Sequence, residues 1–379
     1  MRAALETRAA RALRLAYRAR VALMAAFTAA GAAAMGVYWQ SSLVSKGIED
    51  AYFRSMIAAH EGDYLAALRD SHLGCKTIAF RSPDVAIVGD SHSYAGWDYP
   101  ELQRALPGRR VGACVLAGMF PENLADFLRS LRSAEWAPRY VVFGIQPRMF
   151  WDVDERKDRV GRARRQIRDI PQPKESLPTL ATGHWRDIEH FKGAGTSFAA
   201  RLRALEAGLA TVDPNDVEQV LHARTADFYA LTFWLKYVED GKPYAAMPAV
   251  VRDICAAVRQ SGVRLGVAYI PESRWLNERY SPAQRTQFLE VASLFRACAD
   301  WVDVSPFESA GWDNRDFINR YLLDDYPYAG WRQPDIALAW IAERPNERRW
   351  HFFDPDHMNA SGARMYSHLM GPKIAAWSR

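Results

Sequence analysis

The chain alternates short apolar runs with segments of helical spacing over most of its length. Apolar runs of roughly four to eight residues between turn residues are typical of strands buried on both faces. Such runs lie at Asp84–Val88, Arg110–Leu116, Tyr140–Ile145, Val263–Ile270 and Trp301–Val304. Each of them is predicted to form a strand.

The segments between these runs have the spacing of helices. Pro121–Ala134 places Leu124, Phe127, Leu128 and Leu131 on one helical face. Further helices are predicted from Pro248 to Gln260, from Ser281-Pro282 to Cys298, and over residues 361–377. Strands that alternate with helices indicate a parallel sheet covered on both faces, an α/β three-layer αβα sandwich. Ligands bind such sheets at the carboxyl ends of the strands.

The N-terminal end has a different pattern. Val21–Ser45 has no charged residue, and about 20 such residues cross a bilayer core as a helix. Six arginines precede this stretch, so the positive-inside rule leaves residues 1–20 in the cytoplasm and the later chain outside it. We therefore expect a single-pass inner-membrane protein with an extracytoplasmic, periplasmic domain. A cleaved signal peptide and a buried soluble helix remain alternatives.

These patterns divide the chain into four parts. Residues 1–20 form a basic cytoplasmic tail, 21–43 a transmembrane anchor, 44–80 a stem or linker, and 81–379 the extracytoplasmic domain. Within the domain, residues of about 151–247 interrupt the alternation of strand and helix. We interpret them as an insertion near the site, which is either a lid or partner surface or a solvated decoration.

The charge of the chain argues against nucleic-acid binding. The net charge is +5 over 379 residues, but residues 1–20 hold six arginines and one acid. The remaining chain is balanced, with 43 basic against 43 acidic residues, so no global field attracts polyanions. The cysteines are Cys75, Cys114, Cys255 and Cys298. An extracytoplasmic location permits disulfides, but the sequence leaves open whether these cysteines are paired or inert core residues.

Two motifs carry candidate chemistry. Gly89-Asp90-Ser91-His92 directly follows the first strand, where a serine at a strand-to-helix turn exposes its hydroxyl above the sheet edge. Near the C-terminus, Asp354 and His357 stand three residues apart before the last helix. A hydroxyl nucleophile needs a base, and the base needs an acid that orients its ring. Asp356 is the alternative for the orienting acid.

In these motifs the sequence resembles the SGNH (GDSL-type) hydrolase superfamily. The resemblance covers about residues 81–379 and implies that Ser91 is the nucleophile, His357 the base and Asp354 the acid. It also implies an oxyanion hole made by Ser91, Gly118 after the second strand, and a third donor after the third strand. The family has an asparagine at that last place, and this sequence has Gln146.

The basic tail, single span and external domain resemble the membrane-anchored acyltransferase subgroup of this superfamily. That subgroup includes the D-alanyl transfer (DltD-like) proteins of teichoic acid modification and the SGNH proteins of alginate and peptidoglycan O-acetylation. The resemblance implies a membrane-bound O-acyltransferase (MBOAT-type) partner and a cell-envelope polysaccharide or teichoic-acid-like acceptor. It implies no cofactor.

Other polar residues have weaker claims to a role. His92, Asn123 and Trp275 are candidate substrate-binding residues, although each is also an ordinary turn or core residue in its context. His351, Asp354, Asp356 and His357 together offer metal-ligand atoms, but in no recognised ligand spacing, and we expect no metal. The sequence thus favours an extracytoplasmic serine O-acyltransferase that moves an acetyl or D-alanyl group. A membrane-tethered esterase and a non-catalytic glycan-binding scaffold are the alternatives.

Overall fold

Five parallel strands form the central sheet of the computed structural model, in the order β2-β1-β3-β6-β7. The strands are β1 (Val85–Gly89), β2 (Val111–Val115), β3 (Tyr140–Ile145), β6 (Arg264–Tyr269) and β7 (Trp301–Asp303). The prediction of five strands is confirmed at all five places. The structure describes residues 20, 21, 23–25, 27–29, 55, 57–68, 74–132, 134–168, 170, 238, 241–309, 312–320, 351–353 and 356–379.

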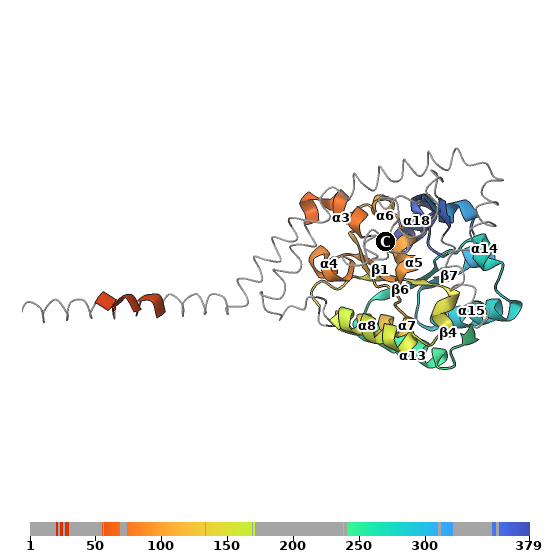
Figure 1. Cartoon of the computed structure of the whole chain (residues 1–379), viewed down its shortest axis with the longest axis horizontal. Coiled ribbons are helices and arrows are strands. Elements are labelled where there is room, and N and C mark those ends of the chain that lie inside the picture. The colour runs from red at the N-terminus through yellow and green to blue at the C-terminus, as the bar shows by residue number, and fades with distance from the viewer. Residues whose placement is uncertain are drawn as a thin grey trace, which may run out of the picture.

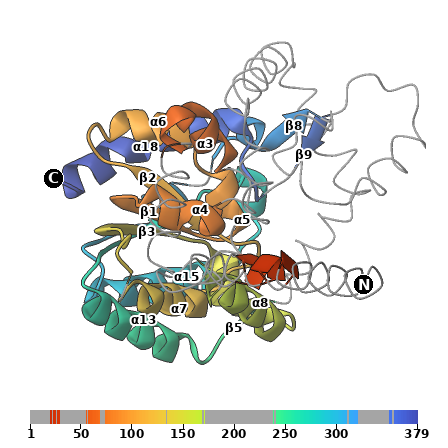
Figure 2. The ribbon, with the colours of Figure 1, turned by 90° about the vertical axis from the view of Figure 1, so that its left-hand side faces the viewer.

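Helices cover both faces of the sheet, so the molecule has the predicted three layers (Figures 1 and 2). In Figure 2 one face of the sheet carries the helices α3 (Glu61–Ala67), α6 (Tyr99–Ala105) and α18 (Ala360–Trp377). The opposite face carries α7 (Pro121–Leu131), α8 (Arg156–Arg168), α13 (Met247–Ser261) and α15 (Pro282–Leu294). Each face encloses its own cluster of buried apolar side chains.

The helix boundaries have local causes in the sequence. Ser281 and Gln284 form a capping box at the start of α15, and Asn359 accepts a hydrogen bond from the Gly362 N–H at the start of α18. Gly262 ends α13 in the left-handed conformation with φ of 73°. The short helices are α5 (Ser91–Ala95), α14 (Arg274–Asn277), α16 (Ser305–Glu308), η1 (Pro147–Phe150), η2 (Phe295–Ala297) and η3 (Asn314–Phe317).

Two disulfides join segments of the domain that are distant in the chain. Cys75–Cys114 joins α4 (Gly74–Arg81) to β2, and Cys255–Cys298 joins α13 to the residue that follows η2. All four cysteines of the chain are therefore paired, which the sequence had left open. Disulfides of this kind persist in oxidising compartments.

The domain begins earlier than the predicted boundary at residue 81. Tyr64 of α3 is fully buried, and α4 lies against the edge strand β2, to which Cys75 is bonded. Residues of the predicted 44–80 stem therefore contribute to the core of the domain. They are covered by apolar neighbours in the same way as the later helices.

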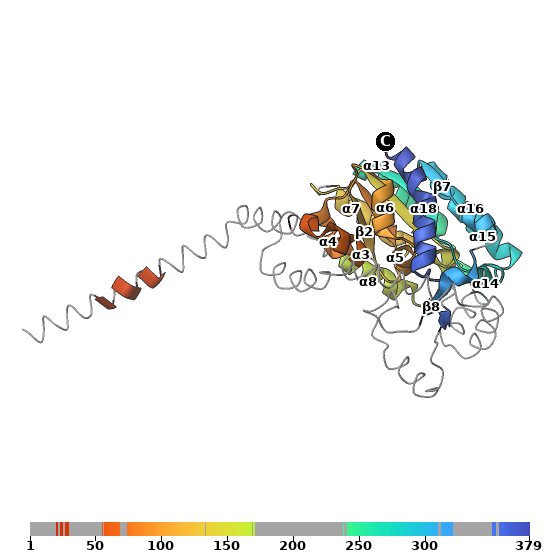
Figure 3. The same ribbon diagram turned by 90° about the horizontal axis from the view of Figure 1, so that it is seen from above.

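Two short antiparallel strand pairs lie outside the central sheet. β4 (Trp151–Asp152) pairs with β5 (Lys242–Pro243), at the two ends of the predicted insertion. β8 (Ile318–Arg320) pairs with β9 (His351–Phe353), which leads into the second predicted motif (Figure 3). Most of the 151–247 insertion lies outside the described residues, so the choice between a lid and a decoration stays a prediction.

Within the predicted anchor, the described residues between 20 and 29 are helical, and Leu23, Met24 and Phe27 are exposed. No helix among the described residues has the length and apolarity that a bilayer crossing requires.

Replacing either disulfide by a pair of alanines should lower the free energy of unfolding by about 2–4 kcal/mol. The expectation follows because the bonds close loops across 39 and 43 positions of the chain and restrict the unfolded ensemble. Urea unfolding of Cys75→Ala/Cys114→Ala and Cys255→Ala/Cys298→Ala measures the loss. An unfolding free energy that neither double substitution changes would show that the sulfurs are not bonded in solution.

Candidate active site

Ser91 and His357 lie 266 positions apart in the chain and meet at the carboxyl end of β1. Ser91 is the first residue of α5, immediately after the β1 strand and Asp90. His357 stands between β9 and α18. The Ser91 Oγ and His357 Nε2 atoms are 2.9 Å apart, and each residue is 8% exposed. The predicted meeting of a hydroxyl and an imidazole is therefore present in the structure.

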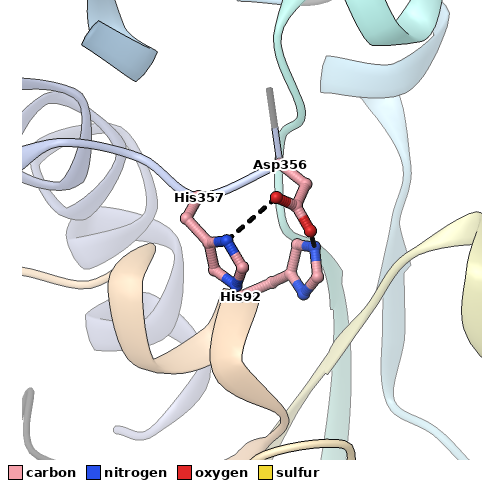
Figure 4. Close-up of side chains that lie close together, drawn as sticks. All are labelled: His92, Asp356 and His357. Carbon is pink, nitrogen blue, oxygen red and sulfur yellow. Dashed lines mark ion pairs between the residues drawn. The ribbon is translucent and has the colours of Figure 1, made fainter. Parts of the chain in front are cut away.

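Asp356 places a carboxylate beside this imidazole. Its Oδ1 atom lies 2.9 Å from His357 Nδ1 (Figure 4), and Ser91 Oγ faces the other ring nitrogen. A hydroxyl, an imidazole and a carboxylate thus follow one another at contact distance, in the order of a serine-hydrolase triad. We predicted from the sequence that Asp354 is the orienting acid, with Asp356 as the alternative. Asp354 lies outside the described residues.

The loop that carries Asp356 and His357 is fixed at its C-terminal end. Asn359 caps α18 with its side chain, and its own N–H donates to the Asp316 carbonyl oxygen at 2.7 Å. Gly362 packs so closely on this contact that a Cβ atom there would lie 2.8 Å from the same oxygen. Both ends of the loop are anchored, because β9 precedes it and pairs with β8.

Two glycines allow α5 to pack against the sheet directly below Ser91. A Cβ atom at Gly89 or at Gly144 would lie 2.0 Å from the Ser93 Oγ atom. The Ser93 side chain therefore occupies space that only glycine leaves open on β1 and β3. The first turn of α5, with Ser91 at its start, is held close to the strand ends as a result.

A second imidazole, that of His92, lies behind the triad. Its Nε2 atom is 2.8 Å from Asp356 Oδ2 (Figure 4), and its Nδ1 atom is 3.1 Å from Asp90 Oδ2. The ring is 1% exposed and stacks on the His357 ring with centroids 4.6 Å apart. From the sequence we expected His92 to bind substrate or to be a turn residue. That expectation depended only on its position directly after Ser91.

The Asp90 carboxylate accepts hydrogen bonds from several groups. It accepts from the His92 N–H at 3.0 Å and from the side chains of Gln146 and Arg148, which follow β3. Burial alone would raise the pKa of this carboxyl, but the charges of His92, Arg148 and His357 outweigh it and hold the pKa below its ordinary value. Asp90 is therefore a buried anion.

The predicted oxyanion donors have different surroundings. Gly118 has φ of 71° in the turn after β2, and a Cβ atom there would lie 2.9 Å from Arg159 Cδ, so the position favours glycine. β1 and β2 are neighbours with Gly89 opposite Val115, which places this turn beside the one that carries Ser91. The Gln146 amide nitrogen donates to Asp90 instead, so its role as a third oxyanion donor stays a prediction.

The other two predicted substrate-binding residues have structural contacts. The Asn123 side chain is fully buried, accepts from the Phe120 N–H and donates to the Val160 carbonyl oxygen, so it joins α7 to α8. These contacts use both ends of the amide for packing rather than for a ligand. Trp275 lies in α14, partly buried, with the Arg279 guanidinium 3.5 Å from its ring centroid.

Among the described residues, His92, Asp356 and His357 offer atoms within 4.8 Å of one another, the one such group that resembles a metal site. Each imidazole already holds one oxygen of the Asp356 carboxylate at 2.8–2.9 Å. His357 also contacts the Ser91 hydroxyl. We therefore interpret the group as a cluster of ion-pair contacts around the Asp356 carboxylate. The side chains of His351 and Asp354, which the sequence added to the metal alternative, lie outside the described part.

A buried carboxyl that the triad does not use lies nearby, in the turn after β6. Glu272 is 1% exposed and accepts hydrogen bonds from the hydroxyls of Tyr269 and Tyr280 at 3.0–3.2 Å. Burial is the main cause that raises its pKa to about 7, and the negative charge of Asp356 adds to it. The sequence analysis did not single out Glu272.

No protein-family model, curated protein or solved structure matches this chain.

Asp356→Asn should lower kcat for a soluble ester about 10³–10⁴-fold, because an amide cannot hold His357 in the tautomer that accepts the Ser91 proton. Asp354→Asn is the matched control and should stay within about twofold of the wild type. Hydrolysis of p-nitrophenyl acetate measures both, with circular dichroism as the check on folding. The reverse pattern would assign the orienting acid to Asp354.

Glu272→Gln should change the pH dependence of stability. The native carboxyl has a pKa of about 7 and the unfolded one an ordinary value near 4.5, so the native state holds the extra proton between these values. The stability from this proton is present below about pH 4.5 and is lost as the pH rises through 7. The unfolding free energy of the variant, relative to wild type, should therefore rise on the order of 3 kcal/mol from pH 4.5 to pH 8. Urea titrations across this range test it, and a constant difference would contradict it.

Proposed function

We propose that this protein is an extracytoplasmic serine O-acyltransferase of the SGNH type, which moves an acetyl or D-alanyl group to a cell-envelope polymer. The observation that carries the proposal is the order of contacts from Ser91 Oγ to His357 Nε2 and from His357 Nδ1 to Asp356. This order, at the carboxyl ends of parallel strands, supports nucleophilic catalysis by a hydroxyl.

The chemistry follows from this geometry. His357 accepts the Ser91 proton while the hydroxyl oxygen attacks the ester carbonyl of the donor. The tetrahedral intermediate collapses, and the leaving alcohol takes the proton from His357. Ser91 then carries the acyl group as an ester.

The second half repeats these steps with a new hydroxyl. His357 takes a proton from the acceptor alcohol, whose oxygen attacks the acyl-enzyme carbonyl. The bond to Ser91 Oγ breaks, and His357 returns the proton to the serine. Asp356 stays ionised and stabilises the imidazolium that forms in each half.

The backbone N–H groups of Ser91 and Gly118 are the proposed donors to the oxyanion. Both lie in turns that follow neighbouring strands, and the glycine has the left-handed conformation. A well-aimed donor of this kind contributes on the order of 10²–10³ in rate.

The two disulfides support the extracytoplasmic part of the proposal, because such bonds persist outside the reducing cytoplasm. The uncharged Val21–Ser45 stretch after six arginines supports a membrane anchor with the domain outside. A tethered enzyme lies close both to a donor delivered through the membrane by an MBOAT-type partner and to a polymer of the envelope.

The second candidate is a tethered esterase, because the same triad also passes an acyl group to water. Ser91 and His357 each keep 8% of their surface exposed. The chemistry of the first half is the same for both functions. They differ only in the acceptor of the second half.

Wild-type protein incubated with p-nitrophenyl acetate and a cell-wall oligosaccharide should release nitrophenol and yield acetylated oligosaccharide, detected by mass spectrometry. Ser91→Ala should lose about 10³-fold or more of both products while its circular dichroism stays unchanged. Nitrophenol with only free acetate would favour the esterase. Activity retained by Ser91→Ala would exclude the triad from either function.

A further inference from the structure

His92 has no place in the triad, yet its ring lies between two buried carboxylates. Nδ1 is 3.1 Å from Asp90 Oδ2 and Nε2 is 2.8 Å from Asp356 Oδ2. An ionised carboxylate only accepts hydrogen bonds, and a neutral imidazole has only one N–H to donate. Both contacts are attractive only if both ring nitrogens carry protons, because an unprotonated nitrogen would point its lone pair at a carboxylate oxygen.

The partners of the two carboxylates require that both act as acceptors. Asp90 faces three further donors, the His92 N–H, the Gln146 amide and the Arg148 guanidinium. Asp356 faces the His357 Nδ1–H, which is the proton position that leaves Nε2 able to accept from Ser91. Among the described contacts of these two carboxylates, Arg148 is the other cation, so a protonated His92 adds a second positive charge beside two anions.

We propose that His92 is a permanent imidazolium that positions Asp356 and, through it, keeps His357 neutral until the reaction begins. This inference rests on the proposed function, because His357 is the base of that reaction. His92 is thus a positioning residue, since it acts on His357 through Asp356.

The balance of charge around His92 supports this assignment. Burial lowers the pKa of His92, but the charges of Asp90 and Asp356 outweigh burial and raise the pKa above its ordinary value. Among the described residues, the other charged or titratable groups near the ring are His357, stacked on it, Arg148 beyond Asp90, and Glu272 in the turn after β6. Below about pH 7 Glu272 is neutral, so its charge does not contribute to the pKa of His92 there.

A fixed positive ring beside the base has a functional consequence. The His92 and His357 ring centroids are 4.6 Å apart, so a second proton on His357 would meet a like charge with no water between the rings. The contact of Asp356 with His92 also reduces the electrostatic stabilisation that Asp356 gives to a second proton on His357. His357 should therefore remain an unprotonated base at lower pH than it would without His92.

The charge state can be measured without any activity. Two-bond ¹⁵N–¹H NMR spectra of the wild-type protein should show both His92 nitrogens protonated at pH 8, with the signals assigned by their loss in His92→Gln or by triple-resonance spectra. A neutral-tautomer pattern for His92 at pH 8 would overturn the proposal, even in a protein that is an active transferase or esterase. An imidazolium pattern in a protein with no acyl turnover would support the charge state and reject the proposed function alone.

The pH profile tests the effect on the base. In His92→Gln the midpoint of the acid limb of kcat/KM for p-nitrophenyl acetate should move up by about one to two pH units, because a neutral amide replaces the repelling charge. The matched control is His368→Gln, at an 83% exposed position on α18, which should leave the midpoint in place. The shift caused by His92→Gln should persist in a Glu272→Gln background, which removes the other group that titrates near 7. A midpoint that His92→Gln leaves unchanged or lowers would overturn the proposal.

Discussion

The carboxylate of Asp356 is shared by two imidazole rings, and this buried charge is the constraint on which the site depends. One oxygen faces His357 and the other faces His92, with 1% of the residue exposed. A buried charge without partners costs several kcal/mol, so the contacts of Asp356 with both rings stabilise the loop in this form. The loop, the first turn of α5 and the strand end of β3 are consequently held together by the same set of charges. A substitution that is intended to change only the chemistry of this site also changes what holds it in place.

The fold was predictable because parallel strands have a strong signature in sequence. The runs from Asp84 to Val88 and from Tyr140 to Ile145 are apolar at nearly every position, since both faces of these strands are covered. The boundary at residue 81 was wrong because α3 and α4 carry little sequence signal for packing. Their burial depends on Tyr64 and on the bond from Cys75 to β2, contacts between segments that are distant in the chain.

The site was predictable in part. Ser91 and His357 followed from motifs next to predicted elements, and the 2.9 Å contact between their side chains agrees with the triad they were expected to form. The choice of acid depends on which way the short loop after β9 turns, a property that residue spacing cannot supply. The bridging position of His92 depends on Asp90 and Asp356 together, and Asp90 serves at once as the cap of α5. The sequence around Asp90 therefore predicts a turn, but it does not show that the carboxylate also contacts His92.

The β4–β5 pair joins the two ends of a long chain segment, and part of that segment can change in length without altering the sheet. Trp151 lies opposite Pro243, so the two ends of the segment between them lie side by side. α8 belongs to this segment and packs into the core through Ala163 and Ile167. Closing the chain that follows α8 costs little extra free energy as it grows, about 0.6 kcal/mol for each doubling of its length. Evolution could therefore exchange the chain after α8 for another while the hydroxyl and its base keep their positions, which separates the recognition of a macromolecule from the machinery of acyl transfer.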